Sequence, residues 1–307
     1  MIKNRQEILF LYDVTDANPN GDPLDENKPR IDEETGINIV TDVRLKRTIR
    51  DYLYSYKGYD GSNGKDIFVR ELESEKSSGG IKDGKARAKD FKENLDEILD
   101  KAIDIRLFGG VIPLDKASIT FTGPVQFNMG RSLNKVNLKH IKGTGAFASE
   151  DGKAQKTFRE EYIIPYSLIG FHGIVNENAA KETKLTDEDI NLMDEAIWNG
   201  TKNLITRSKM GHMPKLMLRV VYKAEQNFFI GDLQNKIELA FDMAEEKLRT
   251  TKDYSLKLDE LVNELILYKN KVEKVIYTAD KNLKLTLKGQ EVDFKDIKEI
   301  KFEEKSY

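Results

Sequence analysis

The chain contains no cysteine, and only three histidines and one tryptophan stand among its 307 residues. The absence of cysteine excludes disulfide bonds and a thiolate nucleophile. His140, His172 and His212 lie far apart and form no HxH or HExxH spacing, so the sequence does not indicate a zinc site. Neither a GxSxG motif nor a P-loop occurs. These absences leave few routes to catalysis.

Long apolar runs are missing as well. The apolar stretch in the N-terminal MIKNRQEILFLYD is too short for a signal peptide, and no segment is long enough to cross a bilayer. Charged residues make up 34% of the chain, and its length allows one large or two modest domains with a buried core. We therefore expect a soluble, cytoplasmic protein.

The chain has little excess charge of either sign. Its 50 basic and 53 acidic residues leave a formal net charge of −3, which argues against indiscriminate binding of polyanions. The bases are segregated, however: residues 41–50 contain four bases and one acid, and residues 201–219 contain five bases and no acid. Because the local field attracts a phosphate more than the net charge does, both segments are candidates for binding nucleic acid.

Apolar periodicity predicts the first elements. Residues 8–14 form a strand candidate, and residues 42–54 form a helix candidate with Thr41 as its N-cap and Asp42 placed favourably for the helix dipole. The helix is amphipathic, with an apolar side made of Leu45, Ile49, Tyr52 and Leu53 and a cationic surface made of Arg44, Lys46, Arg47 and Arg50.

The later segments alternate between insertions and regular elements. We predict a Gly-rich insertion at 57–78, followed by a helix at 86–103 and a strand at 118–126. A hairpin-like excursion at 135–156 comes next, and then strands at 162–175 that are split by Pro165 and Gly170. The rest of the chain is predicted to form a helix capped by Thr186 and Asp189, a strand at 216–222, and helices at 233–249 and 256–268. Without the insertions the order is β-α-β-β-α-β, the split βαβ order of ferredoxin-like folds, which include RNA-recognition domains. The expected fold class is α+β.

Residues 16–27, DANPNGDPLDEN, resemble the loop of an EF-hand calcium site. Oxygen-bearing side chains stand at the first, third and fifth places, and Gly21 stands at the sixth. The twelfth place, which requires a bidentate Glu, is Asn27, and the preceding segment favours a strand over a helix. We favour a turn that leaves a buried strand, with calcium binding as an alternative.

Phosphodiester cleavage and nucleic-acid binding are two further possibilities. A magnesium ion could be gathered by loop acids, namely Asp13, Asp16, Asp22 and Asp25. For binding, the cationic helix is joined by two polar loops. Residues 206–212 carry bases, hydroxyls and a glycine that could contact phosphates, and residues 126–132 include Phe127 and Met129, which could stack on bases.

These segments are similar to the motifs of a known family. The series NPNGDP, PRIDEETG, VTDVRLKRTIRDYL, RLFGG, GPVQFNMGRSL and IIPYSLIGFHGIV resembles the Cas-seven family of CRISPR-associated RAMP proteins, the backbone subunits of type I Cascade complexes. The resemblance is greatest to the type I-B branch, with type I-C next. It covers most of residues 5–222, and the last third of the chain carries no matching motif.

The resemblance implies an RRM-like palm with inserted helical fingers and a thumb hairpin. The implied division is a palm of residues 1–55, 105–132 and 162–250, fingers at 56–104, a thumb at 133–161 and a C-terminal α/β appendage of the palm at 251–307. Backbone subunits of the family stack in several copies along CRISPR RNA, beside other Cascade subunits. They hold the RNA by its backbone and leave bases free to pair with target DNA.

The resemblance also implies site residues. The expected RNA-binding set is Asn20, Thr41, Arg44, Lys46, Arg47, Arg50, Gln126, Asn128, Arg131, Ser132, Arg207, Ser208, Lys209 and His212, with Phe147 and Phe158 as candidates for the thumb residue that displaces a base. Type I backbones do not cleave RNA, so we expect no enzyme activity, catalytic residue, metal or cofactor. The alternative is a metal-dependent RAMP endoribonuclease with a loop Asp. Charge reversal of Lys46 together with Arg50 is expected to abolish assembly and leave the fold intact.

Overall fold

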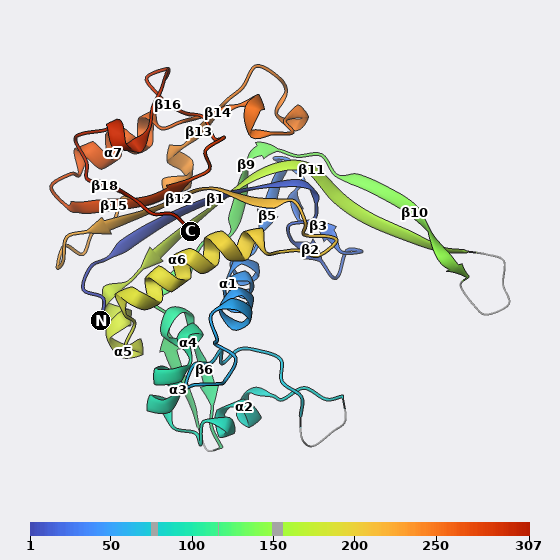
Figure 1. Ribbon diagram of the computed structural model, residues 1–307, viewed down its shortest axis with the longest axis vertical. Helices are drawn as coiled ribbons and strands as arrows, with labels where there is room; N and C mark the ends of the chain where they lie inside the picture. The colour runs from blue at the N-terminus through green and yellow to red at the C-terminus, as the bar shows by residue number, and fades with distance from the viewer. Residues whose placement is uncertain (75–78, 116, 149–155) are drawn as a thin grey trace.

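The computed structural model describes residues 1–74, 79–115, 117–148 and 156–307. Its centre is a large sheet with the strand order β18-β15-β12-β1-β11-β9-β5-β4 (Figure 1). These strands are β1 (Gln6–Ala17), β4 (Ile31–Asp32), β5 (Ile37–Val40), β9 (Gly130–Lys135), β11 (Lys156–Val175), β12 (His212–Tyr222), β15 (Val272–Ala279) and β18 (Phe302–Glu304). The strands predicted near residues 8–14, 162–175 and 216–222 are confirmed.

The central strand β1 is buried on both faces because it lies between β11 and β12 and separates two hydrophobic cores. Ile8, Phe10 and Val14 belong to the core on one face, whereas Leu9 and Leu11 belong to the core on the other. The first face is covered by the helices α1 (Asp42–Tyr56), α5 (Glu177–Thr183) and α6 (Asp187–Lys202) (Figure 1). The sheet is thus the middle layer of three.

The two capped helix starts that the sequence predicts, at Thr41 and Thr186, are confirmed. Thr41 is the N-cap of α1, and its hydroxyl accepts a hydrogen bond from the backbone N–H of Arg44 at 3.4 Å. At the start of α6, Thr186 and Asp189 exchange both hydrogen bonds of a capping box. These caps satisfy N–H groups that have no partner within the helix, so each helix begins at a defined residue.

The second face of the sheet is covered by the C-terminal part of the chain. This layer contains β13 (Glu238–Ala240), β14 (Ser255–Lys257), β16 (Leu285–Leu287), β17 (Gln290–Glu291) and α7 (Asp259–Leu267). The predicted helix at 233–249 is wrong, because two short 3₁₀ turns flank β13 there. Leu233, Ile237 and Leu248 have helical spacing, but an irregular chain buries all three in the second core, and this tertiary packing overrides the helical pattern. The helix predicted at 256–268 is shorter and starts at Asp259.

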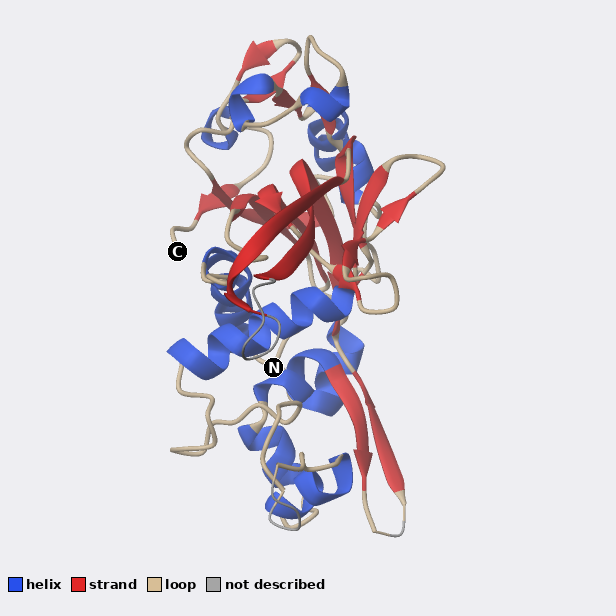
Figure 2. Ribbon diagram, turned by 90° about the vertical axis from the view of Figure 1, so that its right-hand side faces the viewer, coloured by secondary structure: helices blue, strands red, loops and turns tan. Residues whose placement is uncertain are grey.

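A third core lies below the sheet in Figures 1 and 2 and belongs to the inserted region. Its elements are α2 (Gly84–Asp90), α3 (Leu95–Lys101), α4 (Ile103–Phe108), β6 (Gly109–Pro113) and β7 (Ser118–Thr122). The single helix predicted at 86–103 is therefore wrong. Lys92 and Glu93 adopt positive φ angles of 53° and 56°, and the Asn94 side chain caps a new helix. The predicted strand at 118–126 is likewise interrupted, by Gly123 and Pro124.

The hairpin expected near 135–156 pairs β10 (Lys139–Ala148) with the first half of β11 and projects away from the sheet (Figure 1). β11 is continuous, so the expected split at Pro165 and Gly170 is wrong. The register with β1 skips Pro165 and Asp16, and proline is tolerated where no ladder hydrogen bond is required. At Gly170 a Cβ atom would stand 3.0 Å from a Leu11 methyl group, so the strand keeps a glycine for close packing.

Candidate nucleic-acid interface

The N-terminus of α1 is joined to the loop that follows β1. The Asn20 Oδ1 atom accepts hydrogen bonds from the backbone N–H and the hydroxyl of Thr41, both at 2.9 Å. Thr41 in turn caps the helix. The side chain of Asn20 therefore fixes the loop of residues 18–22 against the first turn of α1.

The same loop is joined to residues 206–212, between α6 and β12. The Asn18 N–H donates to the Ser208 carbonyl at 2.9 Å, and the Thr15 N–H donates to the Gly211 carbonyl at 3.1 Å. Gly211 has a φ of +109°, and a Cβ atom there would stand 2.4 Å from the Thr15 carbonyl oxygen, so the close approach requires glycine. Two loops that are about 190 residues apart in the sequence therefore form one surface beside α1.

Residues 126–131 also contact α1 and the strand β5 that precedes it. The Lys46 ammonium donates to Gln126 Oε1 at 3.3 Å, and β9 begins by pairing Gly130 with Val40. Gln126, Asn128, Met129 and Arg131 are exposed. The helix α1 therefore connects the two polar loops that the sequence singles out. Residues 206–212 reach its N-terminus through residues 18–20, and residues 126–131 meet it at Lys46.

Three arginines contribute most of the exposed positive charge of this surface. The side chains of Arg47, Arg131 and Arg207 are each more than half exposed. Arg47 pairs with Asp51 at 2.7 Å and with Glu71 at 3.8 Å, Arg131 pairs with Asp32 at 3.7 Å, and Arg207 pairs with Glu161 at 2.7 Å. Exposed ion pairs of this kind contribute little stability in water, so a phosphate could replace the carboxylate at small cost.

Two further cations of α1 are more enclosed. Lys46 is mostly buried and pairs with Asp42 at 2.9 Å. Arg44 is half-buried and donates to the Thr48 hydroxyl at 3.0 Å, and no ion pair with a carboxylate is found for it among the described residues. Burial lowers the pKa of the Arg44 guanidinium. Arg44 is thus a cation that still lacks a counterion.

Three of the expected RNA-binding side chains are buried, which argues against direct contact with a ligand. Arg50 is 12% exposed and pairs with the fully buried Asp104 at 2.9 Å. The Ser132 hydroxyl is buried, accepts from the Asn38 N–H at 2.9 Å and donates to the Asn134 carbonyl at 2.6 Å. His212 is 2% exposed and lies edge-on against a tyrosine ring, and burial lowers its pKa to about 3. Residue type and position in the sequence do not reveal such burial.

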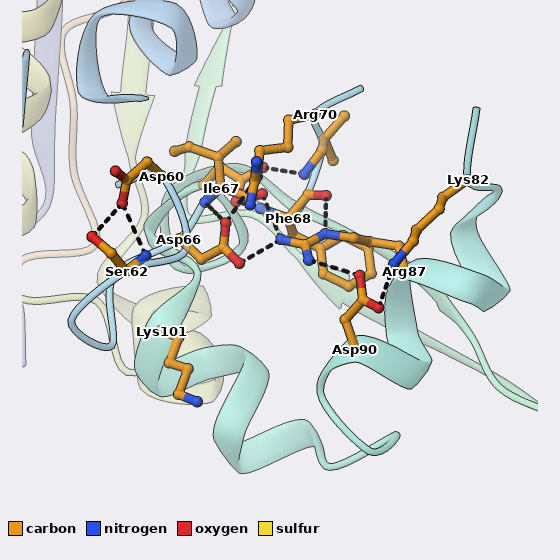
Figure 3. Close-up of polar contacts among 12 residues, drawn as sticks. Asp60, Ser62, Asp66, Ile67, Phe68, Arg70, Lys82, Arg87, Asp90 and Lys101 are labelled. Atoms are coloured by element: carbon orange, nitrogen blue, oxygen red, sulfur yellow. Dashed lines mark hydrogen bonds and ion pairs between the residues drawn. The ribbon is translucent and has the colours of Figure 1, made fainter. Parts of the chain in front are cut away.

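Asp104 connects the inserted region to α1, and Asp66 connects segments within the inserted region. Asp104 accepts hydrogen bonds from the N–H groups of Phe68 and Val69 in addition to Arg50. Asp66 pairs with Arg87 at 2.6 Å and with Arg70 at 3.0 Å, as Figure 3 shows. Arg70 and Arg87 are therefore committed to a structural network.

The loop acids do not come together. Asp13 is buried and its carboxylate accepts from Tyr166 at 3.2 Å, with the Lys215 ammonium at 3.4 Å. Asp22 pairs with Arg30 at 2.7 Å. No group of three or more His, Cys, Asp or Glu side chains that could hold a metal ion is found in the described part of the chain. The sequence alternatives of a magnesium site and a calcium loop thus gain no support from the geometry.

One groove beside the interface was not apparent from the sequence. It has a volume of 610 Å³ and is lined by Lys28, Arg30, Thr41, Met129 and Leu138, among others. Met129 is 57% exposed there, whereas Phe127, the other stacking candidate, is buried in the first core.

The candidate thumb residues lie on the projecting hairpin. Phe147 belongs to β10 and Phe158 to β11, but both side chains fall outside the described residues. No helix in the described ranges is both long and apolar enough to span a membrane.

Comparison with known proteins identifies the family. Residues 4–259 match the family model of the CRISPR-associated protein Cas7. The chain belongs to the Cas7 family. It is 34% identical over 313 residues to a CRISPR-associated protein Cas7 of Haloferax volcanii, and the match covers 92% of this chain and 89% of that protein. The family expected from the ordered motifs is thereby confirmed.

Solved structures show the same fold. A chain of a CRISPR RNA-guided surveillance complex in a pre-nicking state superposes with a TM-score of 0.56 at 11% identity, covering 91% of this chain and 93% of that one. A second CRISPR RNA-guided surveillance complex gives a TM-score of 0.51 at 12% identity, covering 91% and 90%. The mixed α/β architecture of this Cas7 chain is therefore shared with subunits of such complexes.

Proposed function

We propose that this Cas7 chain is a non-catalytic backbone subunit that binds CRISPR RNA and stacks in several copies along it, in a type I surveillance complex of the I-B kind. The observation that carries the proposal is the convergence of α1 and two polar loops on one cationic surface, in a chain of the Cas7 family. Further copies of the chain, other subunits of the complex and target DNA paired with the guide are the proposed partners.

The proposed palm is RRM-like. Four strands in the order β12-β1-β11-β9, with α1 and α6 on one face, support this description. RRM domains stack RNA bases on the opposite sheet face, but here that face is covered by the C-terminal layer. The RNA would therefore run along α1 and the two loops and not across the face of the sheet.

The remaining proposed divisions follow the cores and the hairpin. The fingers of residues 56–104 would extend to the end of β7, because the third core includes Ile112 and is packed by Phe121. The thumb of residues 133–161 corresponds to the projecting hairpin, on which Phe147 or Phe158 would displace a base. Residues 251–307 would serve as the appendage that covers the palm.

The proposed phosphate contacts are the accessible cations. Arg47, Arg131 and Arg207 would exchange carboxylates for phosphates, and Arg44 and Lys46 would add charge next to the helix N-terminus. Polar groups at the same surface would complete the path, namely Asn20, Thr41, Gln126, Asn128 and Ser208. Contacts of this kind bind RNA without reading its sequence.

The test is a triple substitution of Arg47, Arg131 and Arg207 to Gln, with RNA affinity measured at several salt concentrations. Each lost phosphate contact should lower the slope of log K against log[salt] by about 0.7, so the triple variant should lose about 2. A matched control replaces three equally exposed, ion-paired lysines of the C-terminal layer and its edge, Lys257, Lys284 and Lys301. Equal slopes for the two variants would contradict the proposed interface.

The non-catalytic role has its own test. The protein is incubated with labelled RNA and Mg²⁺, and cleavage is compared with that by Asp13→Ala, Asp16→Ala and Asp22→Ala variants. No product is expected, because these acids lie apart and two of them are already paired with basic side chains. A product that disappears in any of the variants would favour the endoribonuclease instead.

A further inference from the structure

Lys209 stands in the 206–212 loop, but its ammonium group points into the protein. The Nζ atom donates to the carbonyl of Asn18 at 2.6 Å and to that of Pro19 at 3.0 Å. No carboxylate in the described part of the chain forms an ion pair with Lys209. A lysine whose role is to bind a phosphate presents its ammonium to the ligand, whereas this one is occupied by the backbone of a neighbouring loop.

The two carbonyls that Lys209 holds lie immediately before the residue that fixes α1. Asn20 follows Pro19 and accepts both hydrogen bonds from Thr41, the N-cap of the helix. Contacts therefore run without a gap from the 206–212 loop, through residues 18–20, to the helix turn that carries Arg44. A change at the first member of this series would move the last.

We propose that Lys209 is a positioning residue of the RNA interface, which holds the first loop in place and thereby sets the N-terminus of α1 for the phosphate chain. The proposal deepens the proposed function, on which its consequence for RNA rests. It assigns Lys209 a role different from the direct contact that the sequence indicates.

The surroundings of the ammonium support this role. Burial and, to a smaller extent, the nearby Arg44 guanidinium lower the pKa of Lys209 to about 8. The other basic group that faces it is His212, whose ring is itself buried and has no hydrogen-bond partner among the described residues. Burial and the neighbouring bases therefore disfavour the charged form of Lys209. The two hydrogen bonds that its ammonium donates to the loop of residues 18–20 offset this cost.

The experiment measures amide hydrogen exchange in the RNA-free protein, so that it does not depend on RNA binding. The reporters are the Asn18 N–H, bonded to Ser208, and the Thr41 N–H, bonded to Asn20. Lys209→Met should raise both exchange rates by roughly tenfold or more, because each hydrogen bond to a charged group is worth that much. Asn20→Ala, which removes only the second connection, should raise the rate at Thr41 and leave that at Asn18 unchanged.

RNA affinity is then measured on the same proteins. Lys209→Met should weaken binding and Lys209→Arg should restore it, while the control Lys202→Met, an exposed lysine at the end of α6, should leave exchange unchanged. If the Asn18 and Thr41 amides remain equally protected from exchange in Lys209→Met, the proposal is overturned. A fall in RNA affinity would then be explained by the loss of a direct contact between Lys209 and RNA. A wild-type protein that binds no RNA would overturn the proposed function, whatever the exchange rates of the loop.

Discussion

Removal of the Arg50 side chain should destabilise the protein more than removal of any other cation on α1. Asp104 is fully buried and receives one hydrogen bond from Arg50 at 2.9 Å and two from the N–H groups of Phe68 and Val69. Breaking a buried ion pair from one side costs about 3 to 5 kcal/mol, because it leaves an uncompensated charge. Since two donors would remain, we expect Arg50→Ala to lower the free energy of unfolding by about 3 kcal/mol.

Urea denaturation of Arg50→Ala and Arg47→Ala tests this reasoning. Arg47 is on the same helix and pairs with Asp51, but its side chain is 56% exposed, so its loss should cost less than about 0.5 kcal/mol. Limited proteolysis should also find the segment around Phe68 and Val69 more accessible in Arg50→Ala. A loss below about 1 kcal/mol, or equal losses in the two variants, would refute the assignment of Arg50 to the fold.

The ion pair between Arg50 and Asp104 also affects the charge reversal of Lys46 together with Arg50, which is expected from the sequence to leave the fold intact. Arg50→Glu would place a second carboxylate beside buried Asp104, where two like charges cannot both remain ionised. The structure therefore contradicts that expectation for Arg50. Lys46 is different, since its ammonium contacts Asp42 and Gln126 near the surface. The interface is tested more cleanly with Arg47, Arg131 and Arg207.

Two further predictions concern pH. Burial raises the pKa of Asp13 to about 6, and the nearby Lys215 opposes this shift. The folded state therefore favours the protonated carboxyl group. The stability that the protonated group contributes is fully present below about pH 4 and is lost as the pH rises to about 6. Relative to wild type, Asp13→Asn should gain about 2 kcal/mol between pH 4 and pH 7, measured by urea denaturation, and a pH-independent difference would contradict the raised pKa. For RNA binding, the positioning role of Lys209 depends on its charged ammonium, which the free protein loses as the pH rises through the lowered pKa of about 8. Above pH 8, the RNA affinity of the wild type should fall by at most about tenfold per pH unit, whereas that of Lys209→Met should not change with pH. Parallel pH profiles for the two proteins would contradict the dependence of RNA binding on the charge of Lys209.

Local patterns in the sequence predict the central sheet and the helices on its first face well. The short apolar run of β1, the apolar side of α1 and the caps at Thr41 and Thr186 each follow from residues within one element. The pattern fails where distant residues decide the backbone. Leu233 and Ile237 have helical spacing, yet packing in the second core keeps the chain irregular. The break at Lys92 and Glu93 depends on positive φ angles that neither residue type favours.

The candidate site was predictable as a set of segments but not as a set of exposed side chains. Clusters of bases marked α1 and the 206–212 loop, and the structure brings them together through Asn20 and Ser208. Which bases remain available depends on partners far away in the sequence. Arg50 meets Asp104, 54 residues later, and Lys209 meets Asn18, 191 residues earlier. Pairing over such separations leaves no local signal.

The covered second face of the central sheet has a consequence for the choice of guide. With both broad faces filled by the protein's own chain, no open platform is left on which a base could be distinguished by its shape or its hydrogen-bonding edge. On the proposed function, recognition is left to arginines on α1, on β9 and in the 206–212 loop, and these touch only what every nucleotide has in common. One invariant subunit could then serve an unlimited repertoire of spacers.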